Sequence, residues 1–196
     1  MKVLFFADSH SNKADIMKVI EKSKKADLVV CLGDVTFFEH ALDLILEDLD
    51  TIGKTVLMLP GNHEDEETLK EFCKKTKHVK YFHKDLMEIE GITFFSYGAG
   101  GFLIDDPEFD EVVVHFQREL VEAKKLILLT HQPPFNTTID IVHGKNVGNM
   151  NIKDFIKDYK PLYALSGHLH EHFGKKDKIG DTIVLNPGPK GRIIKL

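Results

Sequence analysis

Short, continuous apolar runs recur along the first part of the chain, and each of them ends at polar residues. Residues 3–7, 28–32 and 55–59 are such runs. A run of this length that is apolar at every position is typical of a strand covered on both faces. Apolar residues at helical spacing follow each run, as Ile16 and Val19 follow the first. Strand and helix repeated three times predict a parallel sheet with right-handed connections.

The pattern becomes less regular after residue 78. Further strands are predicted at 79–82, 86–89, 93–97, 126–129, 162–165, 182–185 and 192–196. One long helix is predicted from the apolar positions between Phe109 and Leu120, and a last helix between Ile152 and Tyr159. Residues 132–150 are a polar loop without clear periodicity. Because no linker or repeat interrupts the chain, we expect one domain over residues 1–196.

Five of the predicted strands end in residues that can bind a metal or move a proton. In chain order, these residues are Asp8 and His10, Asp34, Asn62 and His63, His131, and His168 with His170. In open α/β sheets the carboxyl ends of the strands meet at one edge, where ligands bind. Each histidine alone would be interpreted as a hydrogen-bonded structural residue, but that interpretation leaves five polar strand ends unexplained.

The candidate ligands supply carboxylate, amide and imidazole groups, and no thiolate. Such a donor set suits manganese, iron, zinc or cobalt, and does not suit an iron–sulfur cluster. Leaving His63 aside, seven candidates exceed what one ion needs. If Asp34 bridges, they suffice for the two ions of a two-metal hydrolase. An alternative for Asp34 is that its carboxylate caps the following helix.

The order Asp-x-His, Gly-Asp, Gly-Asn-His-Glu, His and Gly-His-x-His resembles that of the calcineurin-like metallophosphoesterases. The resemblance runs from Asp8 to His170, and Asn186-Pro187-Gly188 is similar to the closing motif of the family. It is nearest to the small members that consist of this unit alone. The resemblance implies an α/β fold, a four-layer αββα sandwich in which helices flank two mixed β-sheets.

The resemblance also implies a role for each residue of the motifs. Asp8, His10 and His170 would hold a first metal ion, and Asn62, His131 and His168 a second. Asp34 would bridge the two ions, while His63 would stay off the metals and act as general acid. Two divalent transition metal ions are the expected cofactors: manganese is favoured, and iron, zinc, cobalt and nickel are alternatives.

The function expected from these motifs is a two-metal phosphoesterase, in which a hydroxide shared by the metals attacks phosphorus and His63 protonates the leaving oxygen. A small phosphodiester is favoured because the chain has no additional substrate domain. One alternative is a phosphomonoesterase, protein phosphatase or nuclease on the same core. Another is a metal-binding scaffold protein without catalysis, which would be expected to lose ligands that this chain keeps.

Composition and net charge limit the kinds of binding partner that are expected. The net charge is −5, and the lysines are interleaved with acids, which argues against a surface for nucleic acid. No segment approaches the ~18 apolar residues of a membrane span. Cys31 and Cys73 are predicted to be buried and unpaired, and no signal peptide is evident, so a reducing, cytoplasmic location is expected. The partner expected is a small phosphoester, with the oligomeric state left open.

The loop at 132–150 directly follows a predicted metal ligand, so it is expected to face the substrate. His143 and Asn146 are its candidate substrate-binding residues, against the alternative of ordinary loop polarity. Glu64 is expected to serve the start of the helix that follows it. The remaining histidines are expected at the surface: His40, His78, His83 and His115, with His172 either there or behind the metal ligands.

Overall fold

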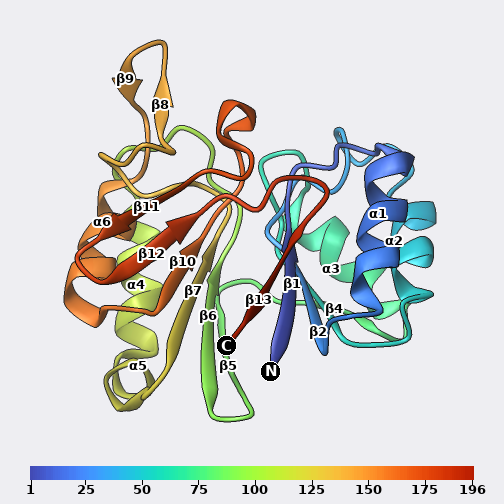
Figure 1. Cartoon of the computed structure of the whole chain (residues 1–196), viewed down its shortest axis with the longest axis horizontal. Helices are drawn as coiled ribbons and strands as arrows, with labels where there is room; N and C mark the ends of the chain where they lie inside the picture. Colours follow the sequence, from blue (N-terminus) through green and yellow to red (C-terminus); the bar gives the residue numbers. More distant parts are fainter.

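Two mixed β-sheets pack face to face, and helices cover the outer face of each (Figure 1). This computed structural model describes residues 1–196. The two chain ends lie close together, and the amino group of Met1 donates a hydrogen bond to the carbonyl oxygen of Leu196 at 3.1 Å. The four-layer αββα sandwich expected from the motifs is confirmed.

The first sheet has the strand order β13-β1-β2-β3-β4, with β1 to β4 parallel and β13 antiparallel to β1. Its strands are β1 (Lys2–Phe6), β2 (Leu28–Cys31), β3 (Val56–Met58), β4 (Val79–Tyr81) and β13 (Arg192–Lys195). Its outer helices are α1 (Lys13–Ser23), α2 (Leu42–Asp50) and α3 (Glu66–Lys74). The side chain of Asn12 caps α1 by accepting from the amides of Ala14 and Asp15.

The second sheet has the order β11-β12-β10-β7-β6-β5, in which the two edge strands are antiparallel to their neighbours. Its strands are β5 (Asp85–Ile89), β6 (Ile92–Tyr97), β7 (Leu126–Thr130), β10 (Tyr163–Leu165), β11 (Lys176–Ile179) and β12 (Thr182–Leu185). Its helices are α4 (Pro107–His115), α5 (Gln117–Glu122) and α6 (Met150–Tyr159). A hairpin of β8 (Ile141–Val142) and β9 (Lys145–Asn146) and a short 3₁₀ helix, η1 (His170–His172), complete the chain.

Three apolar layers hold the sandwich together, and β1 shows why its sequence is apolar throughout. Leu4 and Phe6 point to the layer beneath the helices, whereas Val3 and Phe5 point to the layer between the two sheets. Successive side chains of a strand face opposite sides, so a strand with both faces buried needs an apolar residue at every position. A third layer packs the second sheet against α4, α5 and α6.

The structure differs from the predicted elements in three places. The single long helix is two helices, because Phe116 (φ −101°, ψ 14°) leaves the helical conformation and its ring packs against Phe95 of the sheet. Strand β11 was missed because it alternates charged residues with partly buried ones, as edge strands often do. The loop at 132–150 also contains the β8–β9 hairpin, which its polar sequence did not predict.

The expectation that His83 lies at the surface was wrong. His83 is buried, and its Nδ1 accepts a hydrogen bond from the amide of Gly98 at 2.8 Å. His172 is buried as well, and its Nε2 donates to the carbonyl oxygen of Ile141 at 2.8 Å. His40 and His115 are exposed, as predicted.

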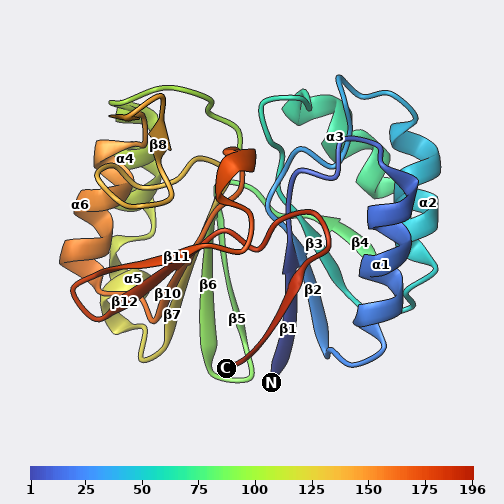
Figure 2. The same ribbon diagram turned by 45° about the horizontal axis from the view of Figure 1, so that its top comes forward.

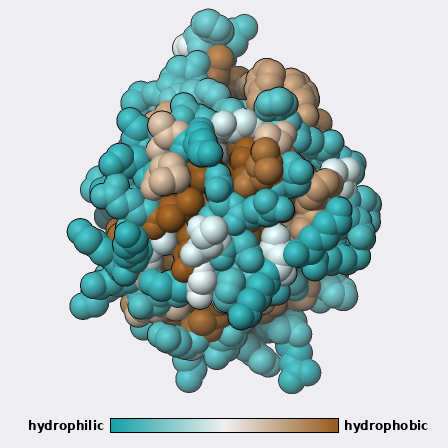
Figure 3. Space-filling model, turned by 90° about the vertical axis from the view of Figure 1, so that its right-hand side faces the viewer, coloured by the Kyte–Doolittle hydropathy of each residue, from teal (hydrophilic) through white to brown (hydrophobic).

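The side of the molecule formed by the helices of the first sheet is mostly hydrophilic, with hydrophobic areas through its middle (Figure 3). Met17 on α1 and Leu44 on α2 are among its exposed apolar side chains. None of the helices combines the length and the apolar character needed to cross a membrane.

The buried His83 leads to a prediction about pH. Burial, with a smaller contribution from the charge of Lys84, lowers the pKa of His83 to about 3. In the unfolded chain His83 has its ordinary pKa of ~6.5, so at pH values between 6.5 and 3 it is protonated in the unfolded chain but neutral in the folded one. The free energy of unfolding therefore falls as the pH falls through this range. His83→Asn keeps an acceptor for the Gly98 amide, and it should lose less stability than wild type between pH 7 and pH 5 in urea unfolding.

The matched control is His115→Asn, which replaces an exposed histidine and should leave the pH dependence of unfolding as in wild type. An unchanged pH dependence in His83→Asn would contradict the assignment.

Candidate metal centre

The predicted ligands gather where the carboxyl ends of strands from both sheets meet (Figure 2). Asp8 and His10 follow β1, Asp34 follows β2, and Asn62 with His63 follows β3, all in the first sheet. The second sheet contributes the other three residues: His131 after β7, and His168 and His170 after β10. The face-to-face packing of the sheets therefore joins two halves of one cluster.

Two of the three groups that could hold a metal ion agree with the predicted ligand sets. One consists of Asp8, His10 and His170, whose ligand atoms all lie within 4.8 Å of one another. The facing Nε2 atoms of His10 and His170 are 2.9 Å apart. The other group, within the same limit, consists of Asp34, His131 and His168.

Asp34 lies between the two groups. Its Oδ2 is 3.8 Å from Nε2 of His10, 3.3 Å from Nε2 of His131 and 3.9 Å from Nε2 of His63. Asn62 belongs to the same side as His131, because its Oδ1 is 3.1 Å from His131 Nε2. The alternative that Asp34 caps α2 is wrong, since the N-cap position of that helix is Ala41.

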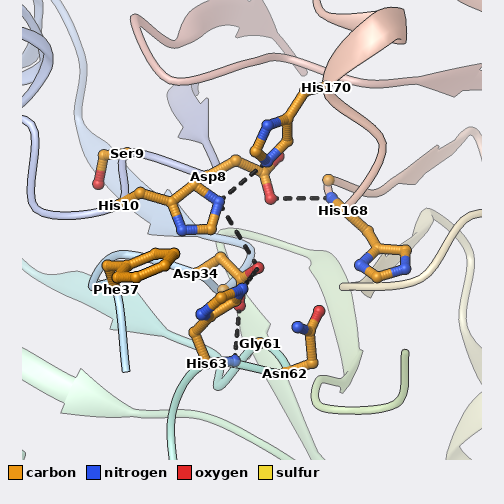
Figure 4. A network of polar contacts seen from close by, with 12 residues as sticks. Asp8, Ser9, His10, Asp34, Phe37, Gly61, Asn62, His63, His168 and His170 are labelled. Atoms are coloured by element: carbon orange, nitrogen blue, oxygen red, sulfur yellow. Dashed lines mark hydrogen bonds and ion pairs between the residues drawn. The ribbon is translucent and has the colours of Figure 1, made fainter. Parts of the chain in front are cut away.

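Each carboxylate uses one oxygen for the backbone and leaves the other for the cluster (Figure 4). Asp8 Oδ1 accepts from the amide of His168 at 2.9 Å, and Asp34 Oδ1 accepts from the amide of His63 at 3.0 Å. The second oxygen of Asp8 is buried without a hydrogen-bond partner. These backbone bonds tie the loops together and aim a free oxygen at the centre of the site.

Two histidine rings are held in the tautomer that a metal ligand needs. Nδ1 of His10 donates to the carbonyl oxygen of Thr36 at 3.2 Å, and Nδ1 of His131 donates to that of Leu32 at 2.8 Å. A proton on Nδ1 leaves the lone pair of Nε2 directed into the cluster. Backbone carbonyls are common partners of this kind behind metal-binding histidines.

The residues fit a divalent metal. Asp8 Oδ2 and His168 Nε2 are buried with no hydrogen-bond partner, and two imidazole nitrogens face each other across 2.9 Å. A buried polar group without a partner destabilises a fold by ~1–3 kcal/mol, so several such groups in one place fit a site that binds a cation. The donors are oxygen and imidazole nitrogen, which suits a transition metal ion.

The charges of the cluster are strongly coupled. Burial opposes the charge of Asp34, but His131 and His63 together outweigh it, and the pKa of Asp34 falls to about 2. Burial likewise opposes the charge of His131, yet the Asp34 carboxylate raises the pKa of that ring to about 9. Without a bound metal, His131 is therefore protonated and supplies a positive charge next to Asp34. A metal ion that binds His131 must displace this proton.

For Asp8 and His168, burial is the largest effect on the pKa. Burial raises the pKa of Asp8 to about 6, against the lowering effect of His131. Burial lowers the pKa of His168 to about 3, and the nearby His131 charge adds to this effect. A bound cation would favour the carboxylate form of Asp8 and the neutral form of His168.

Glu64 has a function that the sequence did not reveal. The expectation that it serves the start of α3 was wrong, because Asp65 caps that helix. The buried Glu64 carboxylate instead accepts from the amides of Asp34 and Gly61 through Oε2, both at 2.9 Å. Its Oε1 accepts from the amide and the hydroxyl of Thr36 at 2.8 and 2.7 Å. Glu64 thus joins the loops that follow β2 and β3.

Gly61 allows these loops to touch. A side-chain carbon on Gly61 would collide with Oδ1 and the amide of Asp34. Gly33 has φ +102°, and a side-chain carbon there would lie 2.7 Å from Nδ1 of His131. The glycines of the Gly-Asp and Gly-Asn-His-Glu motifs are therefore required for close packing around Asp34.

His63 lies inside the cluster, but its surroundings differ from those of the other histidines. It forms the third group of possible ligands with His10 and Asp34. Its ring also packs against two phenylalanines, with ring centroids 5.2 Å away for Phe37 and 4.3 Å for Phe38. No backbone carbonyl holds its Nδ1, which is buried without a partner.

The predicted substrate-binding residues lie away from the ligands. His143 is exposed at the turn of the β8–β9 hairpin, and Asn146 donates to Asp140 Oδ1 at 2.6 Å. The hairpin reaches the site through another residue, Val142, which lines a cavity of about 300 Å³ beside the cluster. The remaining lining residues are Asp34, Asn62, His63, Phe102, His168, Leu169, His170 and Glu171. Phe102 and Val142 could not be predicted from the sequence, because neither belongs to a motif.

Comparison with known proteins agrees with this geometry. The family model of the calcineurin-like phosphoesterases matches residues 1–172. An uncharacterised protein of Methanocaldococcus jannaschii, MJ1162, is 29% identical over 205 residues, which cover 99% of this chain and 91% of that protein.

Solved structures share the fold. The chain is similar to TT1561 of Thermus thermophilus, with a TM-score of 0.77, 13% identity, and coverage of 95% of this chain and 88% of that one. It is also similar to a structure described as a novel archaeal phosphodiesterase, with a TM-score of 0.51, 17% identity, and coverage of 96% and 84%.

The central position of Asp34 generates a prediction about metal content. Asp34→Ala removes the oxygen that lies between the two ligand groups, so the purified, reconstituted variant should lose both ions. Wild type should hold close to two equivalents, measured by elemental analysis after removal of free metal. The control is Glu171→Ala, which removes an exposed carboxylate beside the cavity and should retain both ions. Full occupancy in Asp34→Ala would contradict a shared role for this residue.

A second prediction concerns Glu64. Glu64→Gln has the same shape but turns an NH₂ group toward amide donors, so we expect a loss of about 3 kcal/mol in the free energy of unfolding. The variant should also bind metal more weakly, because the loops that carry Asp34 and Asn62 are no longer joined. Urea unfolding and metal titration measure the two effects.

The matched control for Glu64→Gln is Glu67→Gln, an exposed glutamate at the start of α3, which should change neither stability nor metal binding. Equal stability of the two variants would show that Glu64 does not hold the loops.

Proposed function

Because the chain belongs to the family of calcineurin-like phosphoesterases, we propose that it is a two-metal hydrolase of small phosphodiesters. The family consists of hydrolases that depend on a dinuclear metal site, and the chain carries the candidate His and Asp ligands. The observation that supports the proposal most strongly is the position of Asp34, between one ligand group from Asp8, His10 and His170 and another that includes His131 and His168.

In the proposed arrangement, Asp8, His10 and His170 hold one ion. Asn62, His131 and His168 hold the other, and Asp34 is shared between them. When bound, two divalent ions supply an activated water for attack on phosphorus and positive charge next to its non-bridging oxygens. Manganese suits these oxygen and imidazole donors, as do iron, zinc, cobalt and nickel.

His63 is proposed as the general acid that protonates the leaving oxygen. Its backbone amide is fixed by Asp34, which places the ring beside the cluster and next to the cavity. The absence of a carbonyl behind its Nδ1 separates it from His10 and His131, whose tautomers suit metal binding. Without a carbonyl that fixes one tautomer, the His63 ring can give up and take up a proton, as a general acid must.

The charge of the cavity supports a diester substrate. Its lining contains the carboxylates of Asp34 and Glu171 but no lysine or arginine. A phosphodiester carries one negative charge near neutral pH, whereas a monoester carries up to two and would gain more from cationic side chains. The net charge of −5 likewise disfavours a polymeric nucleic acid as the substrate.

We retain His143 and Asn146 as proposed contributors to substrate choice. They act through the hairpin: Asn146 fastens it to Asp140, and His143 lies at its exposed turn. Both cysteines are buried and unpaired, which supports a reducing, cytoplasmic location as part of the proposal.

The role of His63 can be tested with leaving groups of different acidity. His63→Ala should retain both ions, and its turnover of alkyl or nucleoside esters should fall by ~10²–10⁴-fold. Nitrophenyl esters should lose less, because nitrophenolate leaves without a proton. Kinetics on both types of ester, with metal content measured in parallel, separate the two roles.

The control for this experiment is His115→Ala, which removes an exposed histidine on α4 and should behave as wild type. Loss of an ion from His63→Ala, or an equal fractional loss on both types of ester, would show that His63 is not the acid.

A further inference from the structure

Three phenylalanines around the metal centre are exposed, although their burial would stabilise the fold. Phe37 and Phe38 follow Asp34 and have exposed fractions of 56% and 68%. Phe102 comes from a loop of the second sheet and is 61% exposed. Large apolar side chains gathered at the rim of a site are typical of a surface that binds a ligand.

The backbone that presents Phe37 and Phe38 is strained. Phe38 has φ 48°, Glu39 φ 61° and Ala41 φ 57°, all in the left-handed region that side chains disfavour. Hydrogen bonds hold this loop: the Phe37 amide donates to Ser11 Oγ, and the Glu39 amide donates to Thr36 Oγ1, both at 3.2 Å. Strain that is held in place beside a site usually serves that site.

Phe37 and Phe38 lie beside the proposed acid, and we call these two residues the acid-side wall. Phe37 stacks on the His63 ring with an interplanar angle of 30°. It also approaches His10, with 6.2 Å between the ring centroids. The close-up view shows Phe37 next to His10 and His63, with His168 at the opposite side of the cluster (Figure 4).

Phe102 lies by His168, with 4.6 Å between the ring centroids. Together with Val142 of the hairpin, it lines the cavity of about 300 Å³. We call Phe102 and Val142 the cavity-side wall. The candidate ligands therefore lie between two apolar walls, one from the loop after β2 and the other from the loop after β6 and the β8–β9 hairpin.

We propose that the two walls bind the two substituents of a phosphodiester, an aromatic leaving alcohol against Phe37 and Phe38 and an apolar retained group against Phe102 and Val142. The inference rests on the proposed function, and it names the substrate class. The leaving alcohol belongs on the acid side because its oxygen must reach His63 to receive a proton. Aromatic rings stack favourably in offset or edge-to-face contacts, and the acid-side wall offers two such rings.

The reaction balances as a hydrolysis. Water loses one proton to solvent and forms a bond to phosphorus, and the bond from phosphorus to the leaving oxygen breaks. His63 gives its proton to that oxygen and regains one from solvent. The products are an aromatic alcohol released along the acid-side wall and a monoester of the retained group.

The acid-side wall is tested with two methyl phosphodiesters whose leaving alcohols are similarly acidic, phenol and hexafluoroisopropanol. Because the two alcohols are similarly acidic, protonation by His63 should help both to the same extent. The ratio of kcat/KM for the two esters then measures the contact between the phenyl ring of the leaving group and the acid-side wall. Wild type should prefer the phenyl ester, and Phe37→Ala/Phe38→Ala should reduce the preference by roughly three- to tenfold. Phe37→Leu/Phe38→Leu should also reduce it, because leucine offers apolar area without a ring face.

The cavity-side wall is tested with methyl p-nitrophenyl phosphate and phenyl p-nitrophenyl phosphate, which share a leaving group and differ in the retained group. Phe102→Ala should reduce the preference for the phenyl ester, again by roughly three- to tenfold, and leave the acid-side ratio unchanged. Leu44→Ala is the control for both tests, because it shortens an exposed apolar side chain on α2. Thermal unfolding of every variant verifies that the fold is intact.

Calorimetric titration of the metal-loaded protein with methyl phenylphosphonate and methyl methylphosphonate measures the same preference without turnover. Tighter binding of the phenyl compound, weakened in Phe102→Ala or in the acid-side variants, supports the walls. Ratios that stay at the wild-type value in all the phenylalanine variants would overturn the inference and leave the proposed function standing. If no phosphoester is hydrolysed by the metal-loaded protein, the proposed function fails, and the titration still decides whether the walls bind aromatic groups.

Discussion

The candidate metal centre depends on one buried carboxylate that is not among the candidate ligands. Glu64 accepts hydrogen bonds from the amides of Asp34, Thr36 and Gly61, and so joins the loops that leave β2 and β3. These loops carry the central carboxylate, the amide ligand and the proposed acid. Burial and the nearby Asp34 charge raise the pKa of Glu64. Its hydrogen bonds offset that penalty only while both loops keep their positions, so loop geometry and the charge of Glu64 are mutually dependent.

The same device recurs at the ligands themselves. Asp8 and Asp34 each bind a backbone amide of another loop with one oxygen and direct the other oxygen inward. The bond from the His168 amide to Asp8 joins the two sheets at the site, because Asp8 follows β1 and His168 follows β10. The ligands are thus held by the backbone before any ion binds, and a pre-organised site loses little entropy when it binds a metal. The close imidazole nitrogens and the buried polar atoms without hydrogen-bond partners destabilise the cluster, and a bound divalent cation would remove this destabilisation.

The exposed phenylalanines are close in space to the residues proposed for catalysis. Asp34 and Phe37 are three residues apart, so the loop that supplies the central carboxylate also supplies the ring that stacks on His63. On the other side, the hairpin contributes Val142 to the cavity. The proposed metal binding, proton transfer and substrate contacts therefore all depend on short segments that Glu64 and Asp140 hold in place.

The sequence alone determined the buried strands and the polar residues at their ends, because each of these is a local pattern of apolar and polar positions. The αββα fold was predicted from the resemblance of the motifs to those of a known family. The closeness of Asp8 to Asp34, and that of His131 to His168, was also predictable, since the ends of parallel strands share an edge. That these two pairs meet was decided by the packing of the two sheets. The tertiary structure alone decided the role of Glu64, the burial of His83 and the position of Phe102 beside His168. These depend on contacts between loops that are distant in the chain, and such contacts follow from the packing of the two sheets, which leaves no periodic signal in the sequence.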